Sequence, residues 1–172
     1  MARTMPPEQN FEGMFAVLHG CGVRFVLIGG LAAVINGSPF PTENVDVTPE
    51  HTEANLTRLS AALTELEARI ATRDVPEGLP FSHNAASLAG SAVWSLVTKF
   101  GHLDIAFLPS GTTGFDDLRR DAMNVEIAGM QIAVASLADV IRSKQAANRP
   151  KDQRVLPTLR EILAARNPRN KG

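Results

Sequence analysis

Two aspartates and one asparagine, each in or beside a run of apolar residues, are the side chains of this sequence best suited to chemistry. Asn44 and Asp46 flank Val45 in a short predicted strand, and Asp104 stands within the apolar segment 101–107. Because side chains alternate between the two faces of a strand, Asn44 and Asp46 are expected on one face. A carboxylate in an apolar strand is costly unless it is paired, liganded or at an edge. Asp46 and Asp104 are therefore candidate ligands of Mg²⁺ or Mn²⁺, which prefer oxygen donors.

A double glycine precedes this strand. Gly29 and Gly30 end the apolar run 25–28 and begin a short predicted helix. Glycine lets the backbone approach a phosphate closely, and the N–H groups at a helix start suit an anion. A tight strand-to-helix turn explains the two glycines equally well when they are taken alone. Taken with Asp46 and Asp104, their spacing favours a metal–nucleotide site.

Two hydroxyl residues lie between the glycines and the acidic strand. Ser38 is expected to bond a phosphate oxygen. Thr42 either holds the metal-binding loop or caps a turn, and the turn is the simpler explanation.

The predicted elements that position these residues alternate between helix and strand and end in two helices. Helices are predicted at 7–19, 30–36, 50–67, 115–120, 137–148 and 151–165, and strands at 24–28, 45–48, 68–71, 92–98, 102–107, 124–127 and 130–134. Thr48 is predicted to cap the third helix, and Ser136 to cap the fifth in a capping box with Asp139. Segment 74–86 is expected to be a loop. The order predicts an α/β (α+β) fold, a mixed sheet flanked by helices with a C-terminal helix pair.

Length and charge bound the architecture and the partners. The 172 residues predict a single domain over 1–166 and a disordered tail over 167–172. The net charge of −1 argues against a general polyanion binder, but nine Lys or Arg lie between positions 142 and 171. That segment is either a local nucleic-acid patch or a solvated basic helix face. A single cysteine excludes an intrachain disulfide and a cysteine zinc cluster. With neither an apolar run of about 20 residues nor a signal core, we expect a cytoplasmic protein without membrane contact.

The segment Ile28-Gly29-Gly30, followed after a gap by Asn44-Val45-Asp46, resembles the signature of the DNA polymerase β-like nucleotidyltransferase superfamily. The resemblance implies the nucleotidyltransferase fold, a divalent metal, an NTP substrate, and Asp104 as the carboxylate of a later strand. The superfamily has Asp where this chain has Asn44. An asparagine offers a carbonyl oxygen but no charge, which leaves three explanations open: a natural degenerate member, an engineered inactive variant, and an enzyme that tolerates a weaker site.

The segments 134–144 and 148–152 narrow the resemblance. They are similar to the AbiEii/MenT-type nucleotidyltransferases, the toxin components of bacterial toxin–antitoxin systems. This resemblance implies that Lys144 contacts the NTP triphosphate, that Arg149 and Lys151 extend the basic surface, and that Asp152 orients them by ion pairing. It also implies transfer of nucleotides to the tRNA 3′ acceptor end, which would block translation, and a cognate antitoxin protein as partner.

Two alternatives to the toxin hypothesis stay open from the sequence. The first keeps the enzyme class and changes the acceptor to a small molecule, such as an antibiotic, or to a protein hydroxyl. The second is a catalytically dead nucleotide- or RNA-binding module, since one carboxylate is replaced by Asn44.

Overall fold

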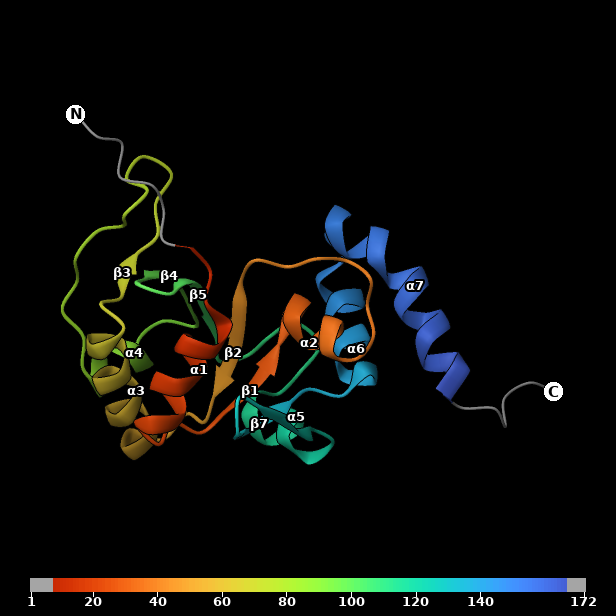
Figure 1. Cartoon of the computed structure of the whole chain (residues 1–172), viewed down its shortest axis with the longest axis horizontal. Helices are drawn as coiled ribbons and strands as arrows, with labels where there is room; N and C mark the ends of the chain where they lie inside the picture. The colour runs from red at the N-terminus through yellow and green to blue at the C-terminus, as the bar shows by residue number, and fades with distance from the viewer. Residues whose placement is uncertain (1–7, 167–172) are drawn as a thin grey trace.

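The computed structural model describes residues 8–166, which form a mixed sheet with helices packed against it (Figure 1). The strands are β1 (Phe25–Ile28), β2 (Val45–Pro49), β3 (Arg69–Ile70), β4 (Val93–Thr98), β5 (Gly101–Ala106), β6 (Met123–Ile127) and β7 (Met130–Val134). The helices are α1 (Phe11–Gly20), α2 (Gly29–Ile35), α3 (Glu53–Glu65), α4 (Ala85–Ala89), α5 (Phe115–Arg120), α6 (Leu137–Ala147) and α7 (Pro150–Arg166). The predicted fold class is confirmed.

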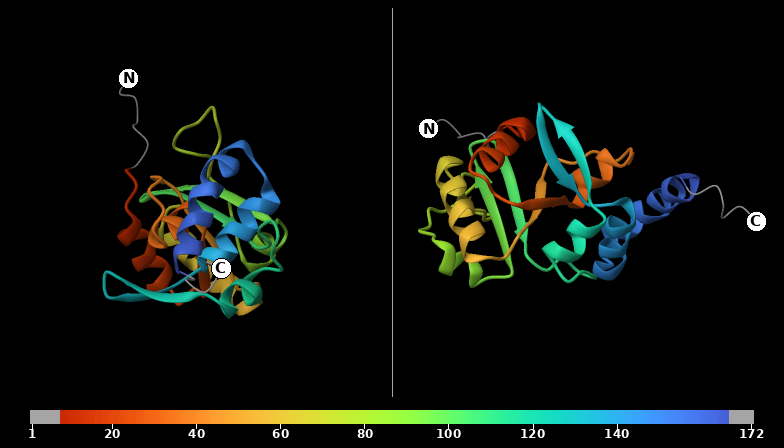
Figure 2. Two further views of the ribbon diagram at one scale, coloured as in Figure 1. Left: turned by 90° about the vertical axis from the view of Figure 1, so that its right-hand side faces the viewer. Right: turned by 90° about the horizontal axis from the view of Figure 1, so that it is seen from below.

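The sheet has the strand order β3-β4-β5-β2-β1-β7-β6. Strands β2 and β5 are parallel, as are β1 and β7, while β1–β2, β3–β4, β4–β5 and β6–β7 are antiparallel. Helices α3 and α4 lie at one end of the molecule and α7 at the other, as both Figure 1 and the right view of Figure 2 show. The C-terminal helix pair α6–α7 therefore stands at the end of the molecule opposite α3.

Alternation of side chains on β2 explains how one short strand joins the core to a polar surface. Val45 and Val47 are almost fully buried, whereas Asp46 between them keeps part of its surface exposed. Burial of such apolar side chains contributes about 1.5–3 kcal/mol each. The two valines thus anchor the strand, and Asp46 is held on the opposite face.

The start of α3 differs from the prediction. Thr48 and Pro49 belong to β2, where Pro49 pairs with Phe25, and the helix is capped instead by Thr52, whose hydroxyl accepts the Asn55 N–H at 3.2 Å. Both threonines are suitable caps. The choice is made by strand pairing, because Thr48 is fully buried against β1.

A helix was missed inside the predicted loop 74–86 and the residues after it. Helix α4 begins at Ala85, and Asn84 and Ser87 form a reciprocal capping box. Leu88 is fully buried and its carbonyl accepts the Trp94 indole N–H at 3.0 Å. The five-residue helix is too short for a periodic apolar pattern, so its caps are the signal that would have revealed it.

The remaining boundaries deviate by a few residues. Helix α1 begins at Phe11 behind an Asn10 cap, and Pro7, its predicted start, lies outside the described residues. The Ser136 hydroxyl caps α6, but the Asp139 carboxylate binds Arg142 instead of completing the predicted capping box. The tail predicted over 167–172 also lies outside the described residues. Within 8–166, no helix combines the length and the apolar character that crossing a bilayer requires.

Candidate functional site

Asp46 and Asp104, here called the acid pair, lie side by side on the parallel strands β2 and β5. They are register partners, and Ser95 on β4 is opposite Asp104. The Asn44 side-chain amide lies 3.5 Å from Asp104 Oδ2 and donates towards it. The three residues that the sequence predicted as metal ligands are therefore brought together at one point of the sheet.

The electrostatic state of the acid pair is unusual. Burial, and then the neighbouring charge of Asp104, raises the pKa of Asp46 from 3.8 to about 6. The positive charges of Lys151, Lys144 and Arg149 act in the opposite direction without cancelling this rise. The protein thus leaves part of the negative charge of the acid pair uncompensated. Uncompensated negative charge of this kind favours a bound cation.

The double glycine is explained by the site's own side chains. Gly29 has a left-handed φ of 69°, and a Cβ there would lie 2.6 Å from Asp46 Oδ2. At Gly30 a Cβ would lie 2.8 Å from Thr42 Oγ1. Both distances are well inside van der Waals contact, so any larger residue would displace Asp46 or Thr42. The glycines thus allow the 42–46 segment to close over the start of α2.

The two hydroxyl residues lie in the loop between α2 and β2. Thr42 Oγ1 is 3.5 Å from the backbone carbonyl oxygen of Asn44, a long contact within the segment that leads to the acid pair. Ser38 Oγ accepts the Phe40 N–H at 3.2 Å, so it shapes the loop. A phosphate contact of Ser38 stays a prediction.

The basic residues meet at the α6–α7 junction, residues 144–152. Asp152 is fully buried; its Oδ2 lies 2.7 Å from Arg149 Nε and its Oδ1 lies 3.6 Å from Lys144 Nζ. The left-handed Asn148 (φ 51°) turns the chain so that α7 folds back along α6. The predicted orientation of Arg149 by Asp152 is confirmed, but its second ion-pair partner is Lys144 rather than Lys151.

Asp152 differs from Asp46 in its titration. Burial alone would raise the pKa of Asp152, but hydrogen bonds from the Arg149 side chain and backbone, with the charges of Arg149 and Lys144, hold it below its ordinary value. The carboxylate is also close to the start of α7, where it accepts the Arg149 N–H at 3.2 Å. Asp152 is thus a fully partnered anion that fixes two cations.

One cleft of about 670 Å³ is lined by these groups except the fully buried Asp152. The acid pair, Asn44, the double glycine, Ser38 and Thr42 line it from the sheet and α2, and Lys144, Arg149 and Lys151 line it from α6 and α7; these three are called the cationic wall. Apolar side chains also line it, among them Phe40, Val93 and Leu108. These apolar residues were not predicted from the sequence, because each comes from a different segment.

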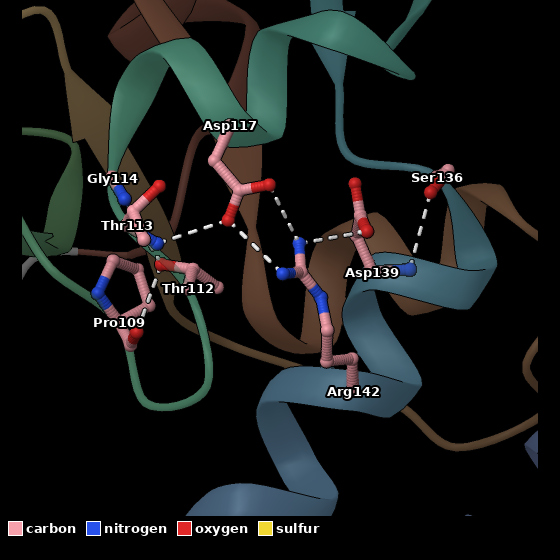
Figure 3. A network of polar contacts seen from close by, with 8 residues as sticks. All are labelled: Pro109, Thr112, Thr113, Gly114, Asp117, Ser136, Asp139 and Arg142. Atoms are coloured by element: carbon pink, nitrogen blue, oxygen red, sulfur yellow. Dashed lines mark hydrogen bonds and ion pairs between the residues drawn. The ribbon is translucent and has the colours of Figure 1, made fainter.

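A second polar network, also missed, joins α5 to α6 beside the cleft (Figure 3). Arg142 donates to both oxygens of Asp117, at 3.0 and 3.2 Å, and to Asp139 Oδ1 at 2.9 Å. The hydrogen bonds from Arg142, and then the Thr113 N–H, lower the pKa of Asp117. Sequence separation hides this network, since Asp117 and Arg142 are 25 residues apart.

The donor set at the acid pair fits a hard divalent cation. It comprises two carboxylates on adjacent strands and the carbonyl oxygen of Asn44, all of them oxygen donors. Within residues 8–166 no group of three or more His, Cys, Asp or Glu is placed to hold a metal. Because Asn44 stands where the superfamily signature has Asp, this donor set carries one negative charge fewer than that signature.

Comparisons with known proteins support the fold. No protein-family description and no curated protein sequence matches the chain. Among solved structures it is similar to the lincosamide antibiotic adenylyltransferase LnuA, bound to lincomycin, with a TM-score of 0.57 and 13% identity over 90% of this chain and 99% of that chain. The antibiotic-resistance factor ANT(2″)-Ia matches with a TM-score of 0.50 and 14% identity over 91% and 88% of the two chains. The fold of this chain is that of the nucleotidyltransferases.

Proposed function

We propose that this protein is a metal-dependent nucleotidyltransferase that transfers a nucleotidyl group from an NTP to an acceptor hydroxyl. The observation that carries this proposal is the acid pair, which faces the cationic wall across one cleft in a nucleotidyltransferase fold. The separation of negative and positive side chains matches the two needs of the reaction, a metal site and a triphosphate site.

In this proposal the carboxylates of Asp46 and Asp104 and the side-chain carbonyl oxygen of Asn44 hold Mg²⁺ or Mn²⁺. When bound, the cation neutralises phosphate charge and lowers the pKa of the attacking hydroxyl. The uncompensated charge at Asp46, seen in its raised pKa, supports this assignment. Asn44 weakens the site by one charge and leaves the protein with reduced affinity for the cation.

The cationic wall binds the triphosphate. Lys144 and Arg149 are held in place by the buried Asp152, so their positive charges are set before the nucleotide arrives. Such preorganised charges stabilise the negative charge that develops on the leaving pyrophosphate. Lys151, whose charge also acts on Asp46, lines the same cleft and adds to this wall.

The transfer is a displacement at the α-phosphorus. The acceptor oxygen forms a bond to the α-phosphorus, the bond from that phosphorus to the bridging oxygen breaks, and pyrophosphate leaves with the bonding electrons. The acceptor proton passes to an Asp104 carboxylate oxygen, which acts as general base. Asp104 is suited to this role because it lines the cleft beside Asp46, with Ser95 as its neighbour on β4.

The tRNA 3′ end is the acceptor predicted from the toxin resemblance. Support comes from α7, which exposes Arg154 and Arg160 beyond the cationic wall. With tRNA as acceptor, the protein would act as the toxin of a toxin–antitoxin pair. A small-molecule acceptor is supported by the two fold neighbours, which are named for antibiotic modification and antibiotic resistance.

The test is label transfer from each α-labelled NTP in the presence of Mg²⁺. The wild-type protein, Asn44→Asp and Asp46→Asn are incubated with total tRNA or with small hydroxyl compounds. We expect Mg²⁺-dependent transfer that is greater for Asn44→Asp and absent for Asp46→Asn. If the Asn44→Asp variant neither bound NTP nor transferred label, the enzyme proposal would be overturned. NTP binding without transfer by any variant would favour the dead binding module.

A further inference from the structure

We propose that the acceptor is a small amphipathic molecule, which packs an aliphatic or aromatic face on Val93 and Leu108 and presents a hydroxyl to the acid pair. Val93 and Leu108 are called the apolar shelf. The inference rests on the proposed nucleotidyl transfer and names the class of its acceptor.

The apolar shelf is unusual for its exposure. Phe40, Val93 and Leu108 are 38%, 56% and 65% exposed, and the other large apolar side chain exposed within residues 8–166 is Leu79 at 45%. Three of these four side chains line one cleft, while Leu79 lies outside it. Single exposed apolar residues need no explanation, but a group of them in a concave site is typical of ligand binding.

Strand register places the shelf within reach of the acid pair. On β5, Ala106 follows Asp104 by two residues and faces the same side, and its partner on β4 is Val93. Because a strand rises about 3.3–3.4 Å per residue, Val93 and Ala106 lie about 7 Å along the strands from the acid pair. Leu108 follows just beyond the end of β5. A ligand of a few ring or chain atoms spans this distance.

The shelf residues Val93 and Leu108 lie on the opposite side of the acid pair from the double glycine, whereas Phe40 comes from the loop that enters β2 at Asn44. Ile28 on β1 pairs with Asp46 in antiparallel register, so Gly29 and Gly30 continue past Asp46 towards Asn44. Val93 and Ala106 lie in the other direction along β4 and β5. A nucleotide bound beside the glycines thus leaves the shelf free for a second substrate, and the reacting groups meet at the acid pair.

The distribution of charge favours a small acceptor over RNA. The cleft's Lys and Arg side chains in the described residues are those of the cationic wall, which come from α6 and α7. The described residues around the shelf, Ala106 and Pro109 among them, include no Lys or Arg that lines the cleft, and the Asp139 carboxylate that lines it is bound by Arg142. Proteins bind nucleic acid largely through cations that neutralise phosphates. With the cationic wall occupied by the triphosphate, the shelf side offers no such cation.

The loop that carries Leu108 is held in position by the network of Figure 3. Thr112 Oγ1 donates to the Pro109 carbonyl at 2.9 Å, and the Thr113 N–H donates to Asp117 Oδ2 at 2.9 Å. Arg142 then fixes Asp117 to α6. A held apolar surface loses little conformational entropy on binding, so its exposure serves an incoming ligand better than that of a loose loop.

The test uses methyl, butyl and hexyl glucoside as probes, below their micelle concentrations, with Mg²⁺ and a non-hydrolysable NTP analogue present. The three share their hydroxyl groups and differ in apolar length. Dissociation constants come from ligand-observed NMR titration of the wild-type protein, Leu108→Ser, Val93→Ser and, as matched control, Leu79→Ser. We expect affinity to rise with chain length by up to about fourfold per methylene. Leu108→Ser and Val93→Ser should weaken hexyl glucoside binding at least about fivefold, and Leu79→Ser should leave it unchanged.

Three outcomes would overturn the proposal: affinity that does not depend on chain length, an equal loss of affinity in Leu79→Ser, and labelling of total tRNA that Leu108→Ser does not reduce. The binding series is independent of catalysis. Failure of the proposed reaction would show separately, as absent Mg²⁺-dependent NTP binding in both the wild-type protein and Asn44→Asp.

Discussion

The acid pair and the α6–α7 junction both contain an aspartate withdrawn from water, but their electrostatic states are opposite. At the acid pair, burial and Asp104 raise the pKa of Asp46 to about 6. At the junction, Arg149 and Lys144 surround the fully buried Asp152, and its pKa is lowered. The junction thus uses its carboxylate for structure, whereas the acid pair retains charge that destabilises the metal-free protein and is available to a cation.

The largest expected effect comes from removing charge at the acid pair. Asp46→Asn should reduce label transfer at least about a hundredfold, because a ligand of the proposed metal is lost. In EDTA the same variant should unfold at higher urea concentration than the wild-type protein at pH 7, since the cost of burying a charge, and then the repulsion from Asp104, is relieved. The two measurements are transfer from α-labelled NTP and urea unfolding followed by circular dichroism.

A loss of stability in Asp46→Asn would contradict the statement that the charge at the acid pair destabilises the metal-free protein. Glu43→Gln serves as the matched control, since Glu43 is an exposed carboxylate in the loop just before the acid pair. It should change both the transfer rate and the unfolding midpoint little.

At the α6–α7 junction the same chemical change should have the opposite effect on stability. Asp152→Asn leaves Arg149 and Lys144 without their buried counter-ion. Because the Arg149 side chain is about half exposed, losing its charge-assisted hydrogen bonds should lower the free energy of unfolding by about 2 kcal/mol. Urea unfolding at pH 7 measures this loss, and Glu161→Gln on the exposed side of α7 is the control. Equal midpoints for Asp152→Asn and Glu161→Gln would rule out a structural role for the junction.

The dependence on pH should separate the two regions again. Because the pKa of Asp152 is lower in the folded protein than its unfolded value of about 3.9, its stabilising effect is fully present above that value and is lost as pH falls below it. Asp46 has the opposite sign: its destabilising effect is absent below about pH 4 and grows as pH rises towards 6.

Urea midpoints at pH 3.5, 5 and 7 in EDTA test both signs. The difference between the wild-type protein and Asp152→Asn should shrink at the lowest pH. The difference between the wild-type protein and Asp46→Asn should grow from pH 3.5 to pH 7. Parallel pH profiles for the three proteins would show that the two carboxylates do not differ as described.

The two regions also differ in how far the sequence predicts them. The junction is contiguous, so a motif of a few residues contains Lys144, Arg149 and Asp152. Predicting the acid pair took two further observations: the alternation of side chains on β2 and the presence of an aspartate in an apolar strand. The structure places the two aspartates, Asp46 and Asp104, side by side. The predicted ion-pair partners of Asp152 were wrong in part: the turn at Asn148 directs Lys144, rather than Lys151, towards it.

What the sequence did not predict depends on tertiary contacts. Val93 and Leu108 are ordinary apolar residues of strand or loop; the β4–β5 register places Val93 on the cleft side of the sheet, and Leu108 lies in the loop just beyond β5. The start of α3 was misplaced because Thr48 and Thr52 are equally good caps, and pairing of β2 with β1 decides between them. Local chemistry was thus predictable where its residues are close in sequence or in an alternating strand.

The smallest expected effect concerns the network that holds the shelf loop. Arg142→Lys keeps the charge but loses the planar fork that donates to Asp117 and Asp139 at once. Losing these hydrogen bonds should lower the free energy of unfolding by about 1 kcal/mol. If the network also holds Leu108 in place, hexyl glucoside should bind about twofold more weakly, while NTP affinity is retained because the cationic wall does not involve Arg142. Arg160→Lys on α7 is the matched control. If Arg142→Lys lost NTP affinity as strongly as glucoside affinity, the cationic wall and the apolar shelf would not be independent, and the Arg142 network would hold both in position.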